Sequence, residues 1–318
     1  MPLKPTLTLA HSPDADDVVM WWPLGDVDLG RPAAIDTGKW IFQPVQIDIQ
    51  EANDRAIARA DLDITAISAH TYPHVRHLYR ITSCGASMGE NYGPKLVCRA
   101  DSPASWWPSL AGCASSFADG PASTGAAEPQ IPTIAVPGTK TTAFLILCLM
   151  LGPKNFRPLP MRFDLVPEAV RSGQADAGLL IHEAQLTFED QGLRKLADLG
   201  EFWNRRHGLP LPLGLNVIRR DLDDRFGPGS VDRIARILTA SVRHAVAHRE
   251  ASRRFLLEHP ACKPEWEDAA LLDRYLRMYV SPLSIDMGDL GRTALATLFK
   301  DAADAALCPP VPDLDVAG

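Results

Sequence analysis

Hydrophobic and polar positions change between strand-like and helix-like spacing along the first part of the chain. Residues 6–10 alternate as a strand does, and residues 43–49 and 62–68 form two further strand-like stretches. Residues 51–60, which separate these two, carry a helical pattern. Because strands joined through a helix normally pair in parallel, this order predicts an α/β domain.

The middle of the chain shows the same order of elements. Residues 133–136 predict a strand that turns into an apolar helix over residues 143–151. Residues 177–181 are short, apolar and followed abruptly by polar residues, which is typical of a central strand where it leaves its sheet. In open α/β sheets, ligands bind beyond the carboxyl ends of such strands.

Other stretches complete the predicted architecture. Residues 95–99 are extended, and residues 208–218 carry two prolines in an apolar run, which suits a crossing segment better than a central strand. Residues 102–132 are rich in Ser, Ala, Gly and Pro and predict a surface insertion. Helical periodicity marks four later stretches: residues 231–248, 249–259, 266–279 and 291–307.

Composition bounds the possible functions. The chain has 318 residues, of which 46% are hydrophobic and 22% charged, so it is globular in composition and long enough for two domains. The formal net charge is −7, so no basic field exists that would attract nucleic acid or an anionic membrane. An anionic ligand would have to be held by local hydrogen-bond donors.

The cysteines and the N-terminal segment indicate the compartment. Six cysteines, with no Cys-x-x-Cys pair and no metal-ligand spacing with histidine, predict reduced side chains. The segment MPLKPTLTL does not have the continuous apolar region of a signal peptide. The longest apolar run, residues 144–151, is far shorter than the about 20 residues that span a bilayer. We therefore expect a cytoplasmic protein with no membrane partner.

His182 and Glu183 directly follow the predicted strand at residues 177–181. A neutral imidazole in that position can accept a proton near neutral pH, and a neighbouring carboxylate can orient it. The alternative interpretation is a structural histidine held by hydrogen bonds. The local pattern leaves both interpretations open.

Polar side chains also follow the other predicted strands. Ser12 and Ser68 lie at one rim of the first predicted domain. The helix that starts near Thr141 and Thr142 offers free N–H groups that suit a carboxylate or phosphate, although the threonines could equally be simple caps. The DADD segment at residues 14–17 lacks the glycine and later glutamate of an EF-hand loop, so no metal site is predicted.

Six motifs occur in a recognisable order. They are HSPDADD (residues 11–17), TAIS (65–68), GP (93–94), PGTKTTA (137–143), IHE (181–183) and GLPLPLG (208–214). This ordered set resembles the 1,4-dihydroxy-6-naphthoate synthase family, which belongs to the futalosine route to menaquinone. The resemblance covers residues 7 to about 299.

The resemblance implies a fold. It is an α/β, two-lobed, type II periplasmic-binding-protein-like fold, with two crossing segments and a ligand cleft between the lobes. Lobe 1 would consist of residues 1–97 and 216–318, and lobe 2 of residues 98–215. The second lobe would carry the threonine pair, His182 and the insertion.

The resemblance also implies an activity. Members of the family split cyclic dehypoxanthine futalosine into 1,4-dihydroxy-6-naphthoate and a sugar-derived fragment, with no cofactor. The general base of the family corresponds to His182. A small anionic substrate would be bound at the strand end matching Ala66, Ile67 and Ser68 and at the threonine pair. Further candidates for substrate binding are Ser12, Asp17 and Glu183.

The chain departs from the family pattern at several points. Ala66 replaces a lysine and Val18 replaces a threonine, and insertions occupy residues 25–40 and 102–132. Because other proteins share the implied fold, two alternatives remain: a sister enzyme such as chorismate dehydratase, and a non-catalytic solute-binding protein. The sequence leaves the oligomeric state undetermined.

Overall fold

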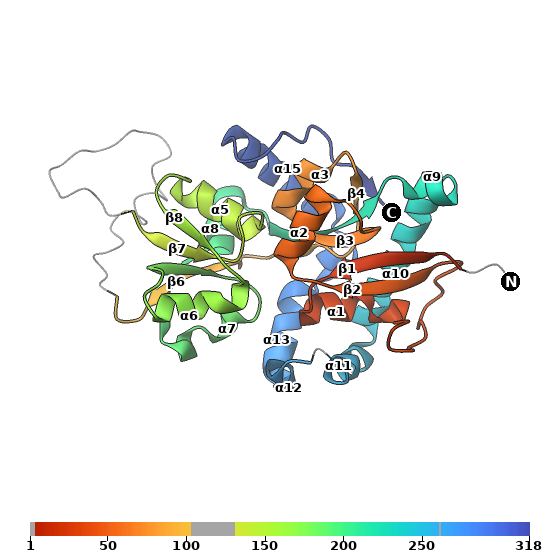
Figure 1. The fold of residues 1–318 in the computed structure, drawn as a ribbon, viewed down its shortest axis with the longest axis horizontal. Helices are drawn as coiled ribbons and strands as arrows, with labels where there is room; N and C mark the ends of the chain where they lie inside the picture. Colours follow the sequence, from red (N-terminus) through yellow and green to blue (C-terminus); the bar gives the residue numbers. More distant parts are fainter. Residues whose placement is uncertain (1–3, 103–130, 261) are drawn as a thin grey trace. The chain divides into compact units, whose positions relative to one another are not determined.

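The computed structural model describes residues 4–102, 131–260 and 262–318, so nearly all of the predicted insertion lies outside the described residues. The chain forms two compact units, of which the first combines Met1–Gly89 with Pro212–Gly318 and the second is Glu90–Leu211 (Figure 1). Each unit contains one mixed β-sheet, which confirms the predicted α/β class. The implied lobe boundaries at residues 97 and 215 lie a few residues beyond these divisions.

The first unit is built on a sheet with the strand order β12-β4-β11-β3-β1-β2, and β5 pairs with β11. Its strands are β1 Thr6–His11, β2 Ile41–Gln46, β3 Ile64–Ser68, β4 Tyr79–Thr82, β5 Ser87–Gly89, β11 Leu211–Arg219 and β12 Val316–Ala317. β1 pairs in parallel with β2 and β3, whereas β11 is antiparallel to β3 and β4. The predicted parallel pairing therefore holds for the first three strands.

The segment from β1 to β3 winds in two directions. The chain passes through α1 (Ala15–Trp21) to β2 on one side of β1, and then through α2 (Ile49–Ala58) to β3 on the other side. Because such crossovers are right-handed, the two helices are expected on opposite faces of the sheet, as Figure 1 shows. The strand order reverses between β1 and β3, so the crevice beyond their carboxyl ends is a topological switch point.

Eight further helices are described in the first unit. They are α3 Tyr72–Val75, α9 Leu222–Phe226, α10 Ser230–Ala247, α11 Arg249–Leu257, α12 Pro264–Glu267, α13 Ala269–Tyr279, α14 Pro282–Ile285 and α15 Gly288–Asp304. The predicted continuous helix over residues 266–279 is wrong, because the chain breaks at Asp268. The carboxylate of Asp268 accepts hydrogen bonds from the N–H groups of Ala270 and Leu271, at 2.9 and 3.1 Å, and so caps α13.

The second unit repeats the same winding. Its sheet has the order β10-β6-β9-β7-β8, in which β7 is parallel to β8 and β9. The elements are β6 Lys95–Arg99, β7 Thr133–Val136, α5 Thr142–Leu151, β8 Arg157–Pro160, α6 Val166–Arg171, β9 Ala177–Leu180, α7 Ala184–Thr187, β10 Leu193–Asp198 and α8 Leu199–His207. α5 and α6 lie on opposite faces of this sheet (Figure 1), and a switch point falls between β7 and β9.

The chain passes from the second unit to the first between Leu211 and Pro212, so residues 208–218 do contain a crossing. However, β11 shows that most of them also form a central strand, which was not predicted. β11 lies between β3 and β4, so it is an interior strand. Pro210 and Pro212 precede the residues that pair with β3, whose register begins at Gly214. The prolines therefore take no place in that ladder, where their missing N–H would leave a gap.

The structure describes five of the six cysteines. Cys84, Cys98, Cys148, Cys262 and Cys308 are free, and Cys113 lies outside the described residues. Among the described helices, none has both the length and the apolar character needed to cross a membrane.

Candidate active site

His182 lies just beyond the carboxyl end of β9, a strand whose four residues are all buried. Its backbone has a φ of +53°, in the left-handed region that few residues other than glycine occupy and in which histidine is over-represented. A backbone in such a sparsely populated region is unfavourable by about 1–3 kcal/mol and is found mainly at functional positions. The half-buried His182 is therefore the strongest candidate for chemistry in the second unit.

The ring of Phe163 packs edge-on against the imidazole of His182, with 4.8 Å between the ring centroids and 65° between the planes. Phe163 begins the 3-10 helix Phe163–Leu165, which follows β8. Because β8 and β9 are both parallel to β7, their carboxyl ends lie at one edge of the sheet. In the sequence, Phe163 is marked only as an aromatic side chain shortly after a strand.

The start of α5 lies at the same edge, because α5 follows β7. Thr141 is its N-cap: the hydroxyl accepts a hydrogen bond from the N–H of Phe144 at 3.2 Å and donates one to the carbonyl of Gly138 at 2.9 Å. Thr141 and Thr142 are both buried. The Thr141 hydroxyl is therefore used in capping. The first N–H groups of α5 lie at the N-terminus of the helix, where an anion is favoured.

Ser68 ends β3 and is held by Asn53 of α2. The Nδ2 of Asn53 donates to the hydroxyl oxygen of Ser68 at 3.1 Å, and its Oδ1 accepts from the Ser68 N–H at 2.8 Å. Because the hydroxyl oxygen is used as an acceptor, its own O–H can donate to a ligand. Ile67 is fully buried and Ala66 has no polar side-chain atom, so these two could offer only backbone groups. Asn53 was missed, although it is a polar residue on the apolar face of α2.

Ser12 and Asp17 form one hydrogen-bonded turn after β1. The N–H of Ser12 donates to Oδ2 of Asp17 at 2.9 Å, and the N–H of Asp14 donates to the Ser12 hydroxyl oxygen at 3.2 Å. Burial raises the pKa of the Asp17 carboxyl, against the opposing effect of His11. Burial likewise lowers the pKa of the His11 imidazole, against the attraction of Asp17. The protonation of one group is thus tied to that of the other.

The other carboxylates of this turn are bound by residues from the end of the chain. Lys263 Nζ lies 2.6 Å from Oδ1 of Asp14, and the hydroxyl of Tyr275 donates to Oδ1 of Asp16 at 2.9 Å. Within the described ranges, no group of three or more His, Cys, Asp or Glu side chains could hold a metal ion. The acidic cluster is therefore a structural network that ties α1 to the C-terminal helices.

A cavity of about 290 Å³ lies beside this turn, at the carboxyl ends of β1 and β2. His11, Gln46 and His259 line it, and Nε2 of Gln46 donates to Nε2 of His259 at 3.3 Å. Its volume is at the lower end of the about 300–1,000 Å³ that small-molecule sites occupy. The first unit therefore has space for a ligand group next to Ser12.

Each unit thus brings its candidate residues to its own switch point. In the first unit, Ser12 and Ser68 follow the two strands that flank it. In the second unit, Thr141 and His182 do the same. Glu183 follows His182 and precedes α7, where it is half-buried. This arrangement of polar groups and free helix N–H groups can bind an anion and accept a proton.

The fold of this chain is similar to those of several solved structures. A protein from Archaeoglobus fulgidus has a TM-score of 0.75 and 33% sequence identity, covering 95% of this chain and 98% of that one. The ligand-binding component of an ABC-type import system from Staphylococcus aureus has a TM-score of 0.66 at 12% identity, covering 99% and 96% of the two chains. The alkanesulfonate-binding protein of Xanthomonas axonopodis pv. citri has a TM-score of 0.62 at 14% identity, covering 98% and 97%.

The last two likenesses show the fold alone, which is that of the periplasmic binding proteins. The predicted fold class is confirmed. By its fold the chain therefore belongs to the class of periplasmic-binding-protein-like α/β proteins, and it has a histidine with φ of +53° at one switch point.

Sequence relatives specify the family. The family model described as Menaquinone biosynthesis matches residues 7–304. The 1,4-dihydroxy-6-naphthoate synthase of Streptomyces coelicolor is 32% identical over 308 residues, which are 96% of this chain and 95% of that protein. The enzyme of the same name from Thermus thermophilus is 30% identical over 306 residues, 96% and 97% of the two chains. The chain belongs to the menaquinone biosynthesis family and is an enzyme, which confirms the resemblance found in the sequence.

Proposed function

We propose that this chain is a lyase that converts cyclic dehypoxanthine futalosine to 1,4-dihydroxy-6-naphthoate, with His182 as the general base. The names of the two curated relatives support the reaction, since both are 1,4-dihydroxy-6-naphthoate synthases. The backbone of His182 supports the choice of base: a histidine with φ of +53° at a switch point is the single observation on which the proposal rests.

The chemistry follows from this position of the imidazole. His182 removes a proton from a carbon beside a carbonyl group of the substrate, and the electron pair left on that carbon expels the sugar portion. The ring that becomes aromatic drives the step forward, and the imidazolium returns its proton to the leaving group or to solvent. Histidine suits this role because its usual pKa lies near the operating pH.

The anionic substrate requires hydrogen-bond donors. The first-turn N–H groups of α5, with Thr142 beside them, provide donors near the carboxyl end of β9. In the first unit, the hydroxyl of Ser68 and the backbone of Ala66 and Ile67 are the proposed substrate contacts. Ser12 and Asp17 act as a rigid turn, held by their hydrogen bond. Its backbone and carboxylate limit which substrate groups can bind beside the turn. Glu183 is proposed to contact the substrate next to the base.

The test is turnover by the purified protein, metal-free and cofactor-free, with product followed by mass spectrometry. His182→Ala should lower kcat by about 10²–10⁴-fold, the usual contribution of a general base. Substrate affinity, measured by calorimetry, should change little. Glu189→Gln is the matched control, because Glu189 is an exposed residue in the same unit and should turn over like the wild type.

Two results would overturn parts of the proposal. Full turnover by His182→Ala would leave the reaction in place but remove its base. Failure of the wild type to turn over cyclic dehypoxanthine futalosine, with dehydration of chorismate instead, would identify the sister activity. A cytoplasmic location remains part of the proposal, and recovery of the protein in the cytoplasmic fraction of fractionated cells tests it.

A further inference from the structure

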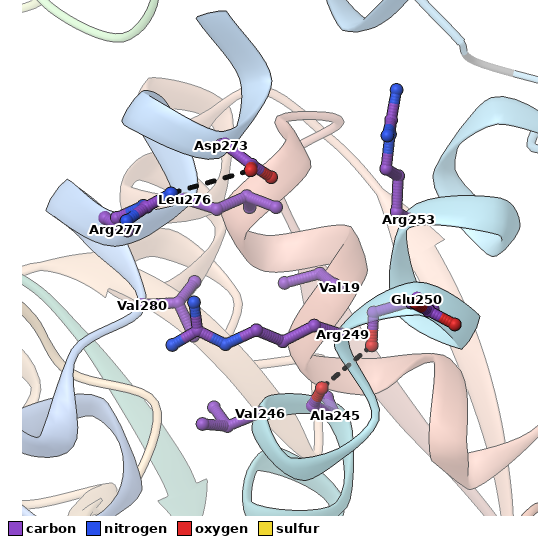
Figure 2. Close-up of a pocket in the computed structure, with 11 residues that line it drawn as sticks. Val19, Ala245, Val246, Arg249, Glu250, Arg253, Asp273, Leu276, Arg277 and Val280 are labelled. Carbon is purple, nitrogen blue, oxygen red and sulfur yellow. Dashed lines mark hydrogen bonds and ion pairs between the residues drawn. The ribbon is translucent and has the colours of Figure 1, made fainter. Parts of the chain in front are cut away.

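A second cavity, of about 220 Å³, lies within the first unit among α1, α10, α11 and α13 (Figure 2). Its apolar lining consists of aliphatic side chains, among them Val19, Val246, Leu276 and Val280. Three arginines, Arg249, Arg253 and Arg277, also line it. This combination of an aliphatic wall with guanidinium groups is separate from the residues assigned to the reaction above.

The arginines are incompletely neutralised. Neither Arg249 nor Arg253 forms an ion pair or a side-chain hydrogen bond with any residue in the described ranges, and Nε of Arg253 is buried without a partner. The two lie four residues apart on α11, where like charges repel each other. Arg277 has a partner, Asp273, but at 3.6 Å, which is beyond hydrogen-bond distance.

Among the three arginines, Arg249 has its side chain directed across the cavity (Figure 2). Figure 2 shows the side chain of Arg249 running across the cavity toward Val280, while the carboxylate of Glu250 points the other way. Glu250 therefore does not neutralise the neighbouring guanidinium. Nε of Arg253 is a buried polar atom without a partner, which is unfavourable, and Arg249 has no counter-ion among the described residues, so binding of an anion in the cavity is favoured at both.

We propose that this cavity, named here the arginine pocket, binds a small aromatic monocarboxylate. A guanidinium forms two parallel hydrogen bonds with a carboxylate and can also stack on a flat ring. The lining carries three arginines against Glu250 and Asp273, a surplus of one positive charge, which matches a monoanion better than a phosphate dianion. The volume lies below the about 300–1,000 Å³ of drug-sized sites, so the ligand has one ring or two fused rings.

The arginine pocket is connected to the turn that carries Ser12 and Asp17. Val19 belongs to α1, and the same helix contains Asp16, which accepts a hydrogen bond from Tyr275 of α13 at 2.9 Å. Leu276 and Arg277 follow Tyr275 directly. A ligand that moves α13 would therefore change the support of that turn. The product proposed above is itself a naphthoate; its action as a ligand here rests on the proposed function, whereas the pocket does not.

The test uses the full chain with isotope-labelled Leu and Val methyl groups. The probe is 2-naphthoate, and nuclear Overhauser effects from its ring protons should reach the methyl groups of Val246, Leu276 and Val280. Neutral 2-naphthamide, of the same shape, should give no such contacts at equal concentration. Arg249→Gln should weaken binding by about tenfold, as expected for loss of a charge-assisted hydrogen bond. Arg254→Gln, on the same helix but outside the lining, should bind as the wild type does.

The expected pattern is contact with all three methyl groups, dependence on the carboxylate and dependence on Arg249. Absence of these contacts in the wild type, or equal binding by Arg249→Gln, would overturn the proposal. Equal binding of 2-naphthamide would make the pocket a purely apolar site, and competition by inorganic phosphate at the same concentration would make it a general anion site; each of these overturns the proposed ligand class. Because none of these measurements requires turnover, their outcome is independent of whether the proposed reaction takes place.

Discussion

His182 shows how a single residue acquires a role from its surroundings. The backbone strain at φ +53° is maintained by β9 on one side and α7 on the other, and the edge of the Phe163 ring restricts the imidazole. A base is effective only when its nitrogen points at the proton to be removed. In the proposed reaction, the neighbouring aromatic ring therefore orients the imidazole that acts as the base.

Phe163→Leu should impair catalysis by loosening the imidazole. We expect kcat to fall by about tenfold with little change in KM, because misplacement of a catalytic group by a fraction of an ångström acts on the transition state. Phe163→Tyr keeps the ring and should retain most of the activity. Steady-state kinetics of both variants at several pH values are the measurement. A rise in KM with unchanged kcat, or an equal fall in activity in both variants, would mean that Phe163 contacts the substrate and does not position the base.

Residues far apart in sequence complete the turn after β1. Asp14 pairs with Lys263 and Asp16 with Tyr275. The sequence identified the polar residues of the strand ends but not these partners. A partner 249 or 259 residues away leaves no local pattern, because only the packing of α13 and the segment before α12 brings it close.

Among the elements, β9 and α6 are in unusually close contact. A Cβ placed on Gly178 would lie 2.6 Å from Cγ2 of Val170 and 2.8 Å from Cγ1 of Val166. Glycine is thus required so that the strand that carries His182 can lie directly against α6. The buried apolar cluster around this contact includes Val97 and Leu180.

Gly178→Ala should therefore destabilise the protein by overpacking. The expected loss in the free energy of unfolding is about 1–3 kcal/mol, measured by urea denaturation. Val170→Ala removes the nearest methyl groups, so the double variant should lose less than the sum of the two single variants. If the two losses in the free energy of unfolding were strictly additive, the strand would have moved away from α6. The close contact would then not be the reason for glycine at this position.

Strands and helices were predicted to different degrees. Residues 95–99 and 133–136 were predicted as extended, and β6 and β7 occupy those residues. β8 was not predicted, because its two prolines argue against a strand; it lies at the edge of the sheet, where proline is tolerated. The periodicity predicts one helix over residues 266–279, but Asp268 interrupts it, because its carboxylate caps α13 and a new helix begins there.

For the whole molecule, the net charge of −7 sets the long-range field that the proposed anionic substrate would meet. Attraction must then come from local groups such as the α5 N-terminus, and the field as a whole repels. In enzymes that steer their substrates electrostatically, the long-range field attracts the substrate and does not repel it.

Raising the ionic strength should therefore not slow the enzyme. Between about 20 and about 200 mM salt, where the screening length falls well below the size of the protein, kcat/KM should stay constant or rise up to about threefold. Stopped-flow or steady-state kinetics at low substrate concentration measure this. A steep fall with salt would indicate a local positive field that outweighs the net charge.

By itself the sequence determined the α/β class, the strand ends that carry His182, Ser12 and Ser68, and the family, because these depend on hydrophobic periodicity and on motifs of adjacent residues. Only the tertiary structure decided that the strand order reverses between β1 and β3 and between β7 and β9. It also decided that Phe163 touches His182 and that three arginines surround one cavity. Strand order and contacts between distant segments depend on how the sheets and helices pack, and packing leaves no signal in the spacing of neighbouring residues.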